Sequence, residues 1–438
     1  MDNGIINLGS NIMSRSAGSF PRKLRINVTA SLVGFMLVGV SGLVMILAIA
    51  KFYPPEILGT FNLVYSIYLL LSQLVGAGIH FSVLRYIAEI GATQPEREAV
   101  ILQAGIVATV ANSLVWISLF LLVRPLLLPL FNARDLGAGL WYVTPALFFC
   151  GLNKVFLNLM NGKEEFVASA LMNSIRALLL IALIVGCVVG GVEGAALPVV
   201  ISVAEGLLFV ILAIYLRKVL FASVQESIME WSRKHLWFGY RSVVGSIFID
   251  VNTRVDVLVL GLFSSAAVVG VYSYVAMLAE GFSQLAIVFR TLINPKLTHA
   301  RFHQNSAALQ AVAVKGRNFG YLILVPLGMS LVVLYIPMVN LFGLSPEFEA
   351  AFVPFAVLMT GLLVGIGYAP LLMIFNQVGM PLEQSKLYIF IFISNLLFNL
   401  SLVPFFGMQG SALGTALSYV ATAGVMKAMV RRKLGISI

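Results

Sequence analysis

Long apolar runs, separated by short polar segments, recur along this chain and constrain its fold more than any other feature. A helix that spans a membrane needs about 20 mainly apolar residues. We expect about twelve such helices, over 28–50, 57–82, 99–122, 139–160, 166–188, 195–216, 242–264, 268–291, 319–341, 350–376, 387–405 and 410–429. A membrane β-barrel is excluded because its strands are alternating segments of about ten residues. The sequence therefore predicts an all-α polytopic membrane protein.

The composition excludes a soluble fold for the bulk of the chain. Of the 438 residues, 60% are hydrophobic and only 11% are charged, whereas a typical soluble domain is about 25% charged. A water-soluble globule of this composition would have too little polar surface to cover itself. A soluble enzyme, a nucleic-acid-binding protein and a disordered chain are therefore excluded, and we expect no nucleic-acid partner.

The net charge of +10 is explained by the orientation of the chain in the membrane. Cytoplasmic loops of membrane proteins retain an excess of Lys and Arg. With a cytoplasmic N-terminus, 21 of the 28 basic residues fall on the cytoplasmic side, only Lys51, Arg124 and Arg134 fall outside, and the remaining four lie within or at the end of apolar runs. We therefore expect a multi-pass protein of the plasma (inner) membrane with both termini in the cytoplasm.

The polar segments divide the chain into two halves. We expect a cytoplasmic N-tail (1–26), a lobe of six helices (27–216), a cytoplasmic linker (217–241), a second lobe of six helices (242–429) and a cytoplasmic C-tail (430–438). In the linker, Leu220, Val224, Ile228 and Trp231 recur at helical spacing beside basic residues. This pattern is typical of an amphipathic helix at the bilayer surface. A plain linker between the lobes is equally compatible with it.

The two halves are related by an internal repeat. An offset of 211 residues gives 12 identities over residues 31–74, among them Gly59 with Gly270 and the triplet 72–74 with 283–285. The offset maps the first two helices onto the seventh and eighth, so both copies enter the membrane from the same side. The repeat is therefore parallel, with a pseudo-twofold axis along the membrane normal, and such repeats build transporters.

Charged residues inside the apolar runs are the candidate functional residues, because a charge in a membrane helix is costly. They are Lys154, Arg176, Glu205, Asp250, Arg254, Asp256, Glu280 and Arg290. Asp250 and Arg254 are four residues apart, so they share a helix face and can form an ion pair. Asp256 points another way, toward the eighth helix or the seam between the lobes. These charges either form a structural network, or Arg254 binds an anionic substrate.

Each of the other basic candidates has two possible roles. Arg176 is too deep in its helix to snorkel comfortably, so it lines a substrate cavity or forms a buried pair with Glu205. Lys154 lies near the cytoplasmic end of its helix, where it contacts substrate or snorkels. Arg290 contacts substrate or anchors its helix at the interface.

The acidic candidates suggest ion coupling. Glu205, Asp256 and Glu280 are carboxylates in apolar surroundings, where burial and neighbouring cations shift proton affinity. We expect them to carry a coupling ion, H⁺ or Na⁺. The sequence contains no Gly-rich phosphate loop for ATP and no metal-spaced cluster of His, Cys and acidic residues. We therefore expect no catalytic residue, no bound metal and no cofactor.

Three stretches resemble a known family. Residues 54–61 are similar to its Gly-Pro-Glu-x-x-Gly-x-Tyr motif, although Pro54 stands where the family usually has Gly. Residues 76–89 are similar to its Gly-rich helix end followed by Arg-x-x-Ala, and residues 250–274 to its Asp-Arg-x-x-Leu-Gly and Val-Gly-x-Tyr. The chain thus resembles the Wzx-type polysaccharide flippases of the multidrug/oligosaccharidyl-lipid/polysaccharide (MOP) exporter superfamily.

The resemblance implies a MATE-like V of two six-helix lobes that works by alternating access. The implied cargo is an undecaprenyl-pyrophosphate-linked oligosaccharide for surface polysaccharide such as O-antigen, moved to the outer leaflet with ion-gradient coupling. The implied partners are this lipid-linked oligosaccharide, membrane lipids, and polysaccharide polymerase and chain-length machinery. The alternatives are a cation-coupled multidrug or metabolite antiporter and, disfavoured by the short outer loops, a polytopic polymerase or glycosyltransferase.

Overall fold

The computed structural model describes residues 22–438 except 91–92 and 304. Within that part every regular element is a helix, and the extended pairing is limited to an isolated bridge between Asn132 and Ser265. The α-helices are α2 (Arg22–Phe52), α3 (Pro55–Gly76), α4 (Ile79–Ile90), α5 (Glu98–Leu127), α6 (Leu136–Gly162), α7 (Phe166–Val189), α8 (Val199–Tyr215), α9 (Arg217–Leu220), α10 (Ile228–Asn252), α11 (Val255–Phe263), α12 (Ala266–Phe302), α13 (Ser306–Phe342), α14 (Pro346–Ala350), α15 (Phe352–Gly365), α16 (Ile374–Gln377) and α17 (Pro381–Leu434). Short 3₁₀ turns are η1 (Pro95–Arg97), η2 (Leu128–Leu130), η3 (Gly194–Ala196) and η4 (Ile366–Leu371).

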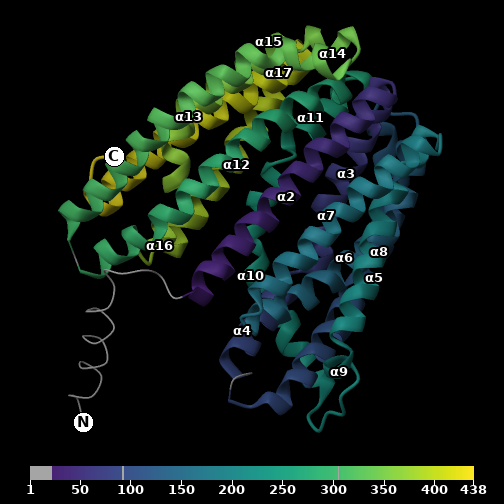
Figure 1. The fold of residues 1–438 in the computed structure, drawn as a ribbon, viewed down its shortest axis with the longest axis vertical. Helices are drawn as coiled ribbons and strands as arrows, with labels where there is room; N and C mark the ends of the chain where they lie inside the picture. The colour runs from purple at the N-terminus through teal and green to yellow at the C-terminus, as the bar shows by residue number, and fades with distance from the viewer. Residues whose placement is uncertain (1–21, 91–92, 304) are drawn as a thin grey trace.

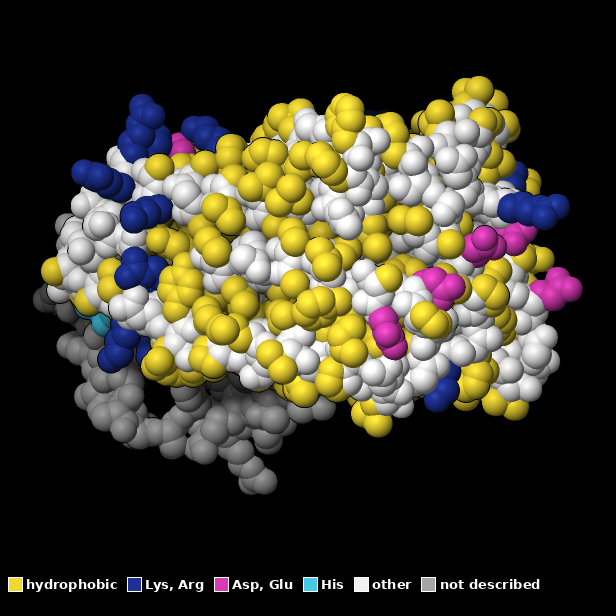
Figure 2. All heavy atoms as spheres, turned by 90° about the horizontal axis from the view of Figure 1, so that it is seen from above, with side chains coloured by type: hydrophobic (Ala, Val, Ile, Leu, Met, Phe, Trp, Pro, Cys, Tyr) yellow, Lys and Arg dark blue, Asp and Glu magenta, His cyan; other side chains and the backbone are white. Residues whose placement is uncertain are grey.

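The surface is that of a membrane protein. Nine helices of the described chain, with α17 counted once, are long and apolar enough to cross a membrane, and Met36–Phe52 is a shorter apolar helix. Figure 2 shows apolar side chains spread over the middle of one face, while charged side chains gather toward its two ends. The expected all-α, multi-pass architecture is confirmed.

Helix α17 folds back on itself at Gly407, whose φ of 53° and ψ of −127° are not helical. The two arms, 381–406 and 408–434, pack closely because Gly414 places its backbone against that of Asn399. Ser411 Oγ also donates a hydrogen bond to Asn399 Oδ1 at 3.2 Å. These arms correspond to the expected helices over 387–405 and 410–429.

Three expected helices are interrupted, among them the run 350–376, where α15 is followed by η4 and α16. The run 57–82 is divided into α3 and α4 by Ala77 and Gly78, whose φ angles of 40° and 68° are left-handed. A left-handed pair cannot continue a right-handed α-helix. The run 242–264 is divided as well, since α10 ends at Asn252 and α11 begins at Val255, but the φ angles of Thr253 and Arg254 between them are negative, at −69° and −126°.

The expected amphipathic helix over 220–231 is not formed. Residues 221–227 are not helical, and α10 begins at Ile228 after the side chain of Ser227 caps its first turn. Trp231 is buried against the first half of the chain instead of lying at a surface. The last part of the expected linker (228–241) and the first part of the expected seventh helix (242–252) therefore form one continuous helix, α10.

The two halves meet at a contact between glycines. We call residues 27–216 the N-half and residues 242–429 the C-half. Gly59 of α3 abuts the backbone at Ala266, and Gly270 of α12 abuts the backbone at Pro55. Both pairings are related by the 211-residue offset of the internal repeat. Figure 1 shows helices of both halves converging at the upper end, and α2 running between them toward the lower end.

Candidate functional site

Glu205 is the centre of a buried network in the N-half. Its side chain is only 2% exposed, and Arg176 of α7 forms an ion pair with it at 2.6 Å. Tyr68 of α3 and Asn153 of α6 donate hydrogen bonds to its two carboxylate oxygens at 3.0 Å and 2.8 Å. Because four helices supply these groups, the network ties α3, α6, α7 and α8 together. The sequence left Arg176 either lining a substrate cavity or paired with Glu205, and the described structure contains this pair.

Arg254 lies at the boundary between the halves. Its position just before α11 follows from the break after Asn252. Its guanidinium is 3.3 Å from the Glu280 carboxylate of α12 and 5.6 Å from the ring centre of Tyr65 of α3. The side chain is 13% exposed, and its buried Nε has no hydrogen-bond partner among the described residues.

The expected pair of Asp250 with Arg254 is not found among the described residues. The spacing of four residues brings side chains together only in an unbroken helix. Here α10 ends between them, so Arg254 turns to Glu280 and Asp250 is left exposed on α10. This prediction was wrong because no strong helix-breaking signal marks residues 252–254.

Asp256 is a buried carboxylate held by neutral donors. The backbone N–H of Val257 donates to one of its oxygens at 2.9 Å, and the Tyr272 hydroxyl of α12 donates to the other at 2.7 Å. Among the described residues, no Lys, Arg or His lies within ion-pair distance of it. Asn399, Ser411 and Thr415 of α17 form a hydrogen-bonded group next to it. Asp256 is therefore the deep acid whose charge the described structure leaves without a cationic partner.

Lys154 is placed at the interruption between α3 and α4. Its ammonium donates to the carbonyl oxygen of Ser72 at 3.0 Å, near the last turn of α3. Asn112 of α5 donates to the carbonyls of Leu74 and Val75 at 2.9 Å and 2.7 Å. The C-terminal end of a helix carries unpaired carbonyls and partial negative charge, so Lys154 and Asn112 stabilise the break.

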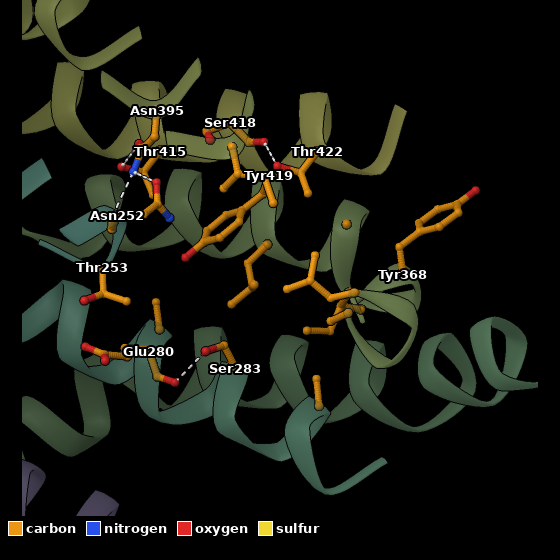
Figure 3. Close-up of a pocket in the computed structure, with 18 of the residues that line it drawn as sticks. Asn252, Thr253, Glu280, Ser283, Tyr368, Asn395, Thr415, Ser418, Tyr419 and Thr422 are labelled. Atoms are coloured by element: carbon orange, nitrogen blue, oxygen red, sulfur yellow. Dashed lines mark hydrogen bonds between the residues drawn. The ribbon is translucent and has the colours of Figure 1, made fainter. Parts of the chain in front are cut away.

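Two cavities flank Glu280. The first, which we call the C-half cavity, has a volume of about 310 Å³ and lies among α10, α11, α12, α15, η4 and α17. Figure 3 shows Asn395, Thr415 and Ser418 on one wall, with Glu280 and Ser283 opposite. Arg290 also lines this cavity, so it lies inside the C-half and not only at an interface.

The second cavity, which we call the interhalf cavity, has a volume of about 590 Å³ and lies between α2 and α3 of the N-half and α12 and α13 of the C-half. Its lining is mostly aliphatic, with Met, Val, Leu and Ile from α2, α12 and α13. Arg254, Glu280 and Gln284 give it one polar side. Glu280 and Gln284 line both cavities, so the two are adjacent.

The uncharged members of these networks were not predicted. Tyr65, Tyr68, Asn153 and Tyr272 lie in apolar runs, where a single aromatic or amide residue gives no distinct signal. Two residues of the repeated Ser-Gln-Leu triplet belong to these sites. Ser72 accepts a hydrogen bond from Lys154, and Gln284 lines both cavities. Across the described chain, no three His, Cys, Asp or Glu side chains are grouped as metal ligands would be.

The comparisons place this geometry among known proteins. The model of a family described as "Polysaccharide biosynthesis protein" matches residues 24–298. No curated protein sequence matches the chain. Among solved structures, the chain is similar to an inward-facing multidrug resistance MATE family transporter of the MOP superfamily (TM-score 0.75, 16% identity, 91% of this chain and 94% of that chain).

Two further solved structures share the fold. Lipid II flippase MurJ, in an inward closed conformation, matches with a TM-score of 0.76 and 16% identity over 92% of this chain and 87% of that one. A MOP superfamily transporter from Pyrococcus furiosus Vc1 matches with a TM-score of 0.64 and 14% identity, over 94% of this chain and 95% of that one. These likenesses confirm the expected MATE-like fold.

Proposed function

The chain belongs to the polysaccharide biosynthesis protein family, and we propose that it is a flippase for an undecaprenyl-pyrophosphate-linked oligosaccharide. The resemblance inferred from the sequence is confirmed by this match, and the fold is that of MOP superfamily transporters. In the proposed cycle, the two halves open alternately to the two sides of the membrane, and the cargo passes from the inner to the outer leaflet.

The observation that carries this proposal is the interhalf cavity with Arg254 at its polar side. An aliphatic space between α2, α12 and α13 suits a polyprenyl chain, which needs no hydrogen bonds. A guanidinium suits a diphosphate because it donates two parallel hydrogen bonds to phosphate oxygens. One cavity thus offers both kinds of surface that a lipid diphosphate requires.

Arg254 has a hydrogen-bond donor available for a diphosphate. Its ion pair with Glu280 is long, at 3.3 Å, and its Nε donor has no partner among the described residues. Arg176 is held more tightly by Glu205, at 2.6 Å. We therefore propose Arg254 as the main phosphate-binding residue. Arg176, Lys154, Asp250 and Arg290 are then secondary contacts for the cargo.

We propose Asp256 as the carrier of the coupling ion, H⁺ or Na⁺. Glu205 and Glu280 already have arginine partners within ion-pair distance. Asp256 has only neutral donors within hydrogen-bond distance among the described residues. A proton or a sodium ion would supply the missing positive charge, and the nearby amide and hydroxyl oxygens of α17 suit either ion.

We propose the plasma (inner) membrane with both termini in the cytoplasm, since basic residues are concentrated on that side. Polysaccharide polymerase and chain-length machinery are the proposed partners downstream, because a flipped repeat unit must be consumed on the outer face.

A deletion strain tests the proposed function. Loss of this protein is expected to leave completed lipid-linked oligosaccharide in the inner leaflet and to remove the surface polymer. Mass spectrometry of extracted lipids, with and without the wild-type gene on a plasmid, measures the accumulation. Unchanged lipids together with altered sensitivity to cationic drugs would instead support the antiporter.

A further inference from the structure

We infer that the C-half cavity binds a neutral sugar unit of the cargo, separately from the site for its diphosphate. The inference rests on the proposed function, because it assigns the second part of the same substrate. Ion coupling is assigned to Asp256 at one end of this cavity, and the sugar subsite is the remainder, toward Tyr368, Tyr388 and Arg290.

The chemistry of the lining suits a sugar. Figure 3 shows Ser418, Tyr419 and Thr422 of α17 facing the cavity, with Ser283 of α12 across it and Tyr368 at the far side. Hydroxyl groups both donate and accept hydrogen bonds, as sugar hydroxyls also do. Tyrosine rings add flat apolar faces, and they combine an apolar body with a polar tip.

The lining also has unused hydrogen-bonding capacity. The Thr422 hydroxyl donates to the Ser418 carbonyl at 2.7 Å, and the Ser283 hydroxyl donates to the Glu280 carbonyl at 2.7 Å. Each hydroxyl oxygen therefore keeps its lone pairs as acceptors. The buried Oε1 of Gln284 has no hydrogen-bond partner among the described residues. A buried polar atom without a partner is costly, and a sugar hydroxyl can satisfy it.

The position of this cavity suits a headgroup attached to a lipid diphosphate. Glu280 and Gln284 form a wall shared with the interhalf cavity, where Arg254 lies. A molecule with its chain in the interhalf cavity and its diphosphate at Arg254 would place its first sugar beside this wall. The volume of about 310 Å³ lies at the small end of ligand pockets, which suits a short sugar unit better than a long chain.

Because acidic side chains line the C-half cavity, a cation is the alternative ligand to a sugar. Glu280 and Asp256 are acidic, whereas Arg290 is basic. Arg254 already faces Glu280 at 3.3 Å, so the acidic excess is small. We therefore favour a neutral sugar, and a cationic dye serves as the probe for the alternative.

Binding measurements on the purified full chain test the inference. The probes are lipid-linked oligosaccharide extracted from the deletion strain, undecaprenyl pyrophosphate without sugar, and the cationic dye ethidium. The test variant, Tyr419→Phe with Thr422→Val, removes two hydroxyl groups from the cavity. The matched control is Thr360→Val on α15, because the Thr360 hydroxyl also donates to its own helix but is exposed and does not line the cavity.

The inference predicts that the double variant binds the glycosylated lipid about tenfold more weakly, because two hydrogen bonds are lost. Its affinity for undecaprenyl pyrophosphate should match that of the wild type and of the control. Equal loss for both lipids, no loss for either, or loss for ethidium alone would overturn the sugar subsite. If the wild type binds neither lipid, the proposed function fails as well, and this result is distinguishable from the others.

Discussion

Gly59 of α3 and Gly270 of α12 lie backbone against backbone, and the 211-residue repeat matches them to each other. The contact is symmetrical, because Gly59 meets Ala266, and Gly270 meets the residue matched to Ala266, Pro55. A side chain at either glycine would overlap a backbone carbonyl of the other half. The contact lies near the start of both helices, at the end expected to face outside. We infer that it closes the outer side in this conformation.

Substitution of these glycines is predicted to open the outer side. Gly59→Ala and Gly270→Ala each force a methyl group against backbone, which cannot move aside easily. Overpacking of this kind destabilises by about 1–3 kcal/mol. The measurement is labelling of a cysteine introduced at Ser265 by an impermeant thiol reagent in intact cells. Labelling should rise in both variants but not in Gly186→Ala, where a Cβ has open space.

The pair of Arg176 and Glu205 is predicted to stabilise the N-half. Glu205→Gln leaves the charge of Arg176 without its partner, and Arg176→Gln leaves the charge of Glu205 without its partner. Each change should lower the free energy of unfolding by up to about 3 kcal/mol. The double variant Arg176→Leu with Glu205→Leu should regain much of this loss because no charge is left unpaired. Thermal unfolding of the purified protein measures the effect. Equal stability of the two single variants and the wild type would show that the pair is not structural.

Asp256 is predicted to couple transport to an ion gradient. Asp256→Asn keeps the shape of the side chain and removes the charge, and its single amide oxygen can accept from only one of the two donors, Tyr272 or Val257. In proteoliposomes, wild-type flipping should accelerate under an imposed H⁺ or Na⁺ gradient, and the variant should show no such acceleration. Glu349→Gln, at an exposed position on α14, is the control and should respond like the wild type. A full response in Asp256→Asn would assign the coupling to another residue.

His235 is predicted to make stability depend on pH. It lies in the part of α10 that precedes the expected membrane span, where Ser82 Oγ and the Ile101 carbonyl contact its two ring nitrogens at 2.9 Å and 3.1 Å. Burial lowers its pKa from 6.5 to about 4, and the hydrogen bond to Ile101 opposes this shift only in part. Below pH 6.5 the unfolded chain therefore binds a proton that the folded chain does not bind.

Stability should accordingly be lost as the pH falls from 6.5 toward 4. The loss contributed by this residue is at most about 3 kcal/mol, at 1.36 kcal/mol for each pKa unit. Melting temperatures measured between pH 7.5 and 4.5 should fall less steeply for His235→Gln than for the wild type. Identical slopes would contradict the prediction.

The sequence predicted those features that follow from hydropathy and from rare charges. The apolar runs predicted the membrane helices, and the repeat led to Gly59 and Gly270. A buried pair of Arg176 with Glu205 was one of the two interpretations left open by the sequence, the other being a place in a substrate cavity, because a charge in a membrane helix is costly. These inferences succeed because the membrane makes a charge or a polar backbone costly.

Other features could not be predicted because they depend on local geometry. The predicted pair of Asp250 with Arg254 requires a continuous helix. Because α10 ends at Asn252, Arg254 pairs with Glu280 instead. The contact of Lys154 with the Ser72 carbonyl likewise depends on the interruption at Ala77 and Gly78, which the sequence did not reveal. Neither break changes the hydropathy of its run, so hydropathy alone cannot locate them.

A flipping assay on Arg254→Gln tests most directly whether Arg254 binds the diphosphate of the cargo. Proteoliposomes would carry lipid-linked oligosaccharide from the deletion strain, and the fraction that becomes accessible to an added glycosidase would be measured over time. We predict that the wild type moves the lipid and that Arg254→Gln, folded and inserted normally, moves it at least about tenfold more slowly, because a charged hydrogen-bond donor to the diphosphate is lost. Transport by Arg254→Gln at the wild-type rate would show that Arg254 does not bind the diphosphate.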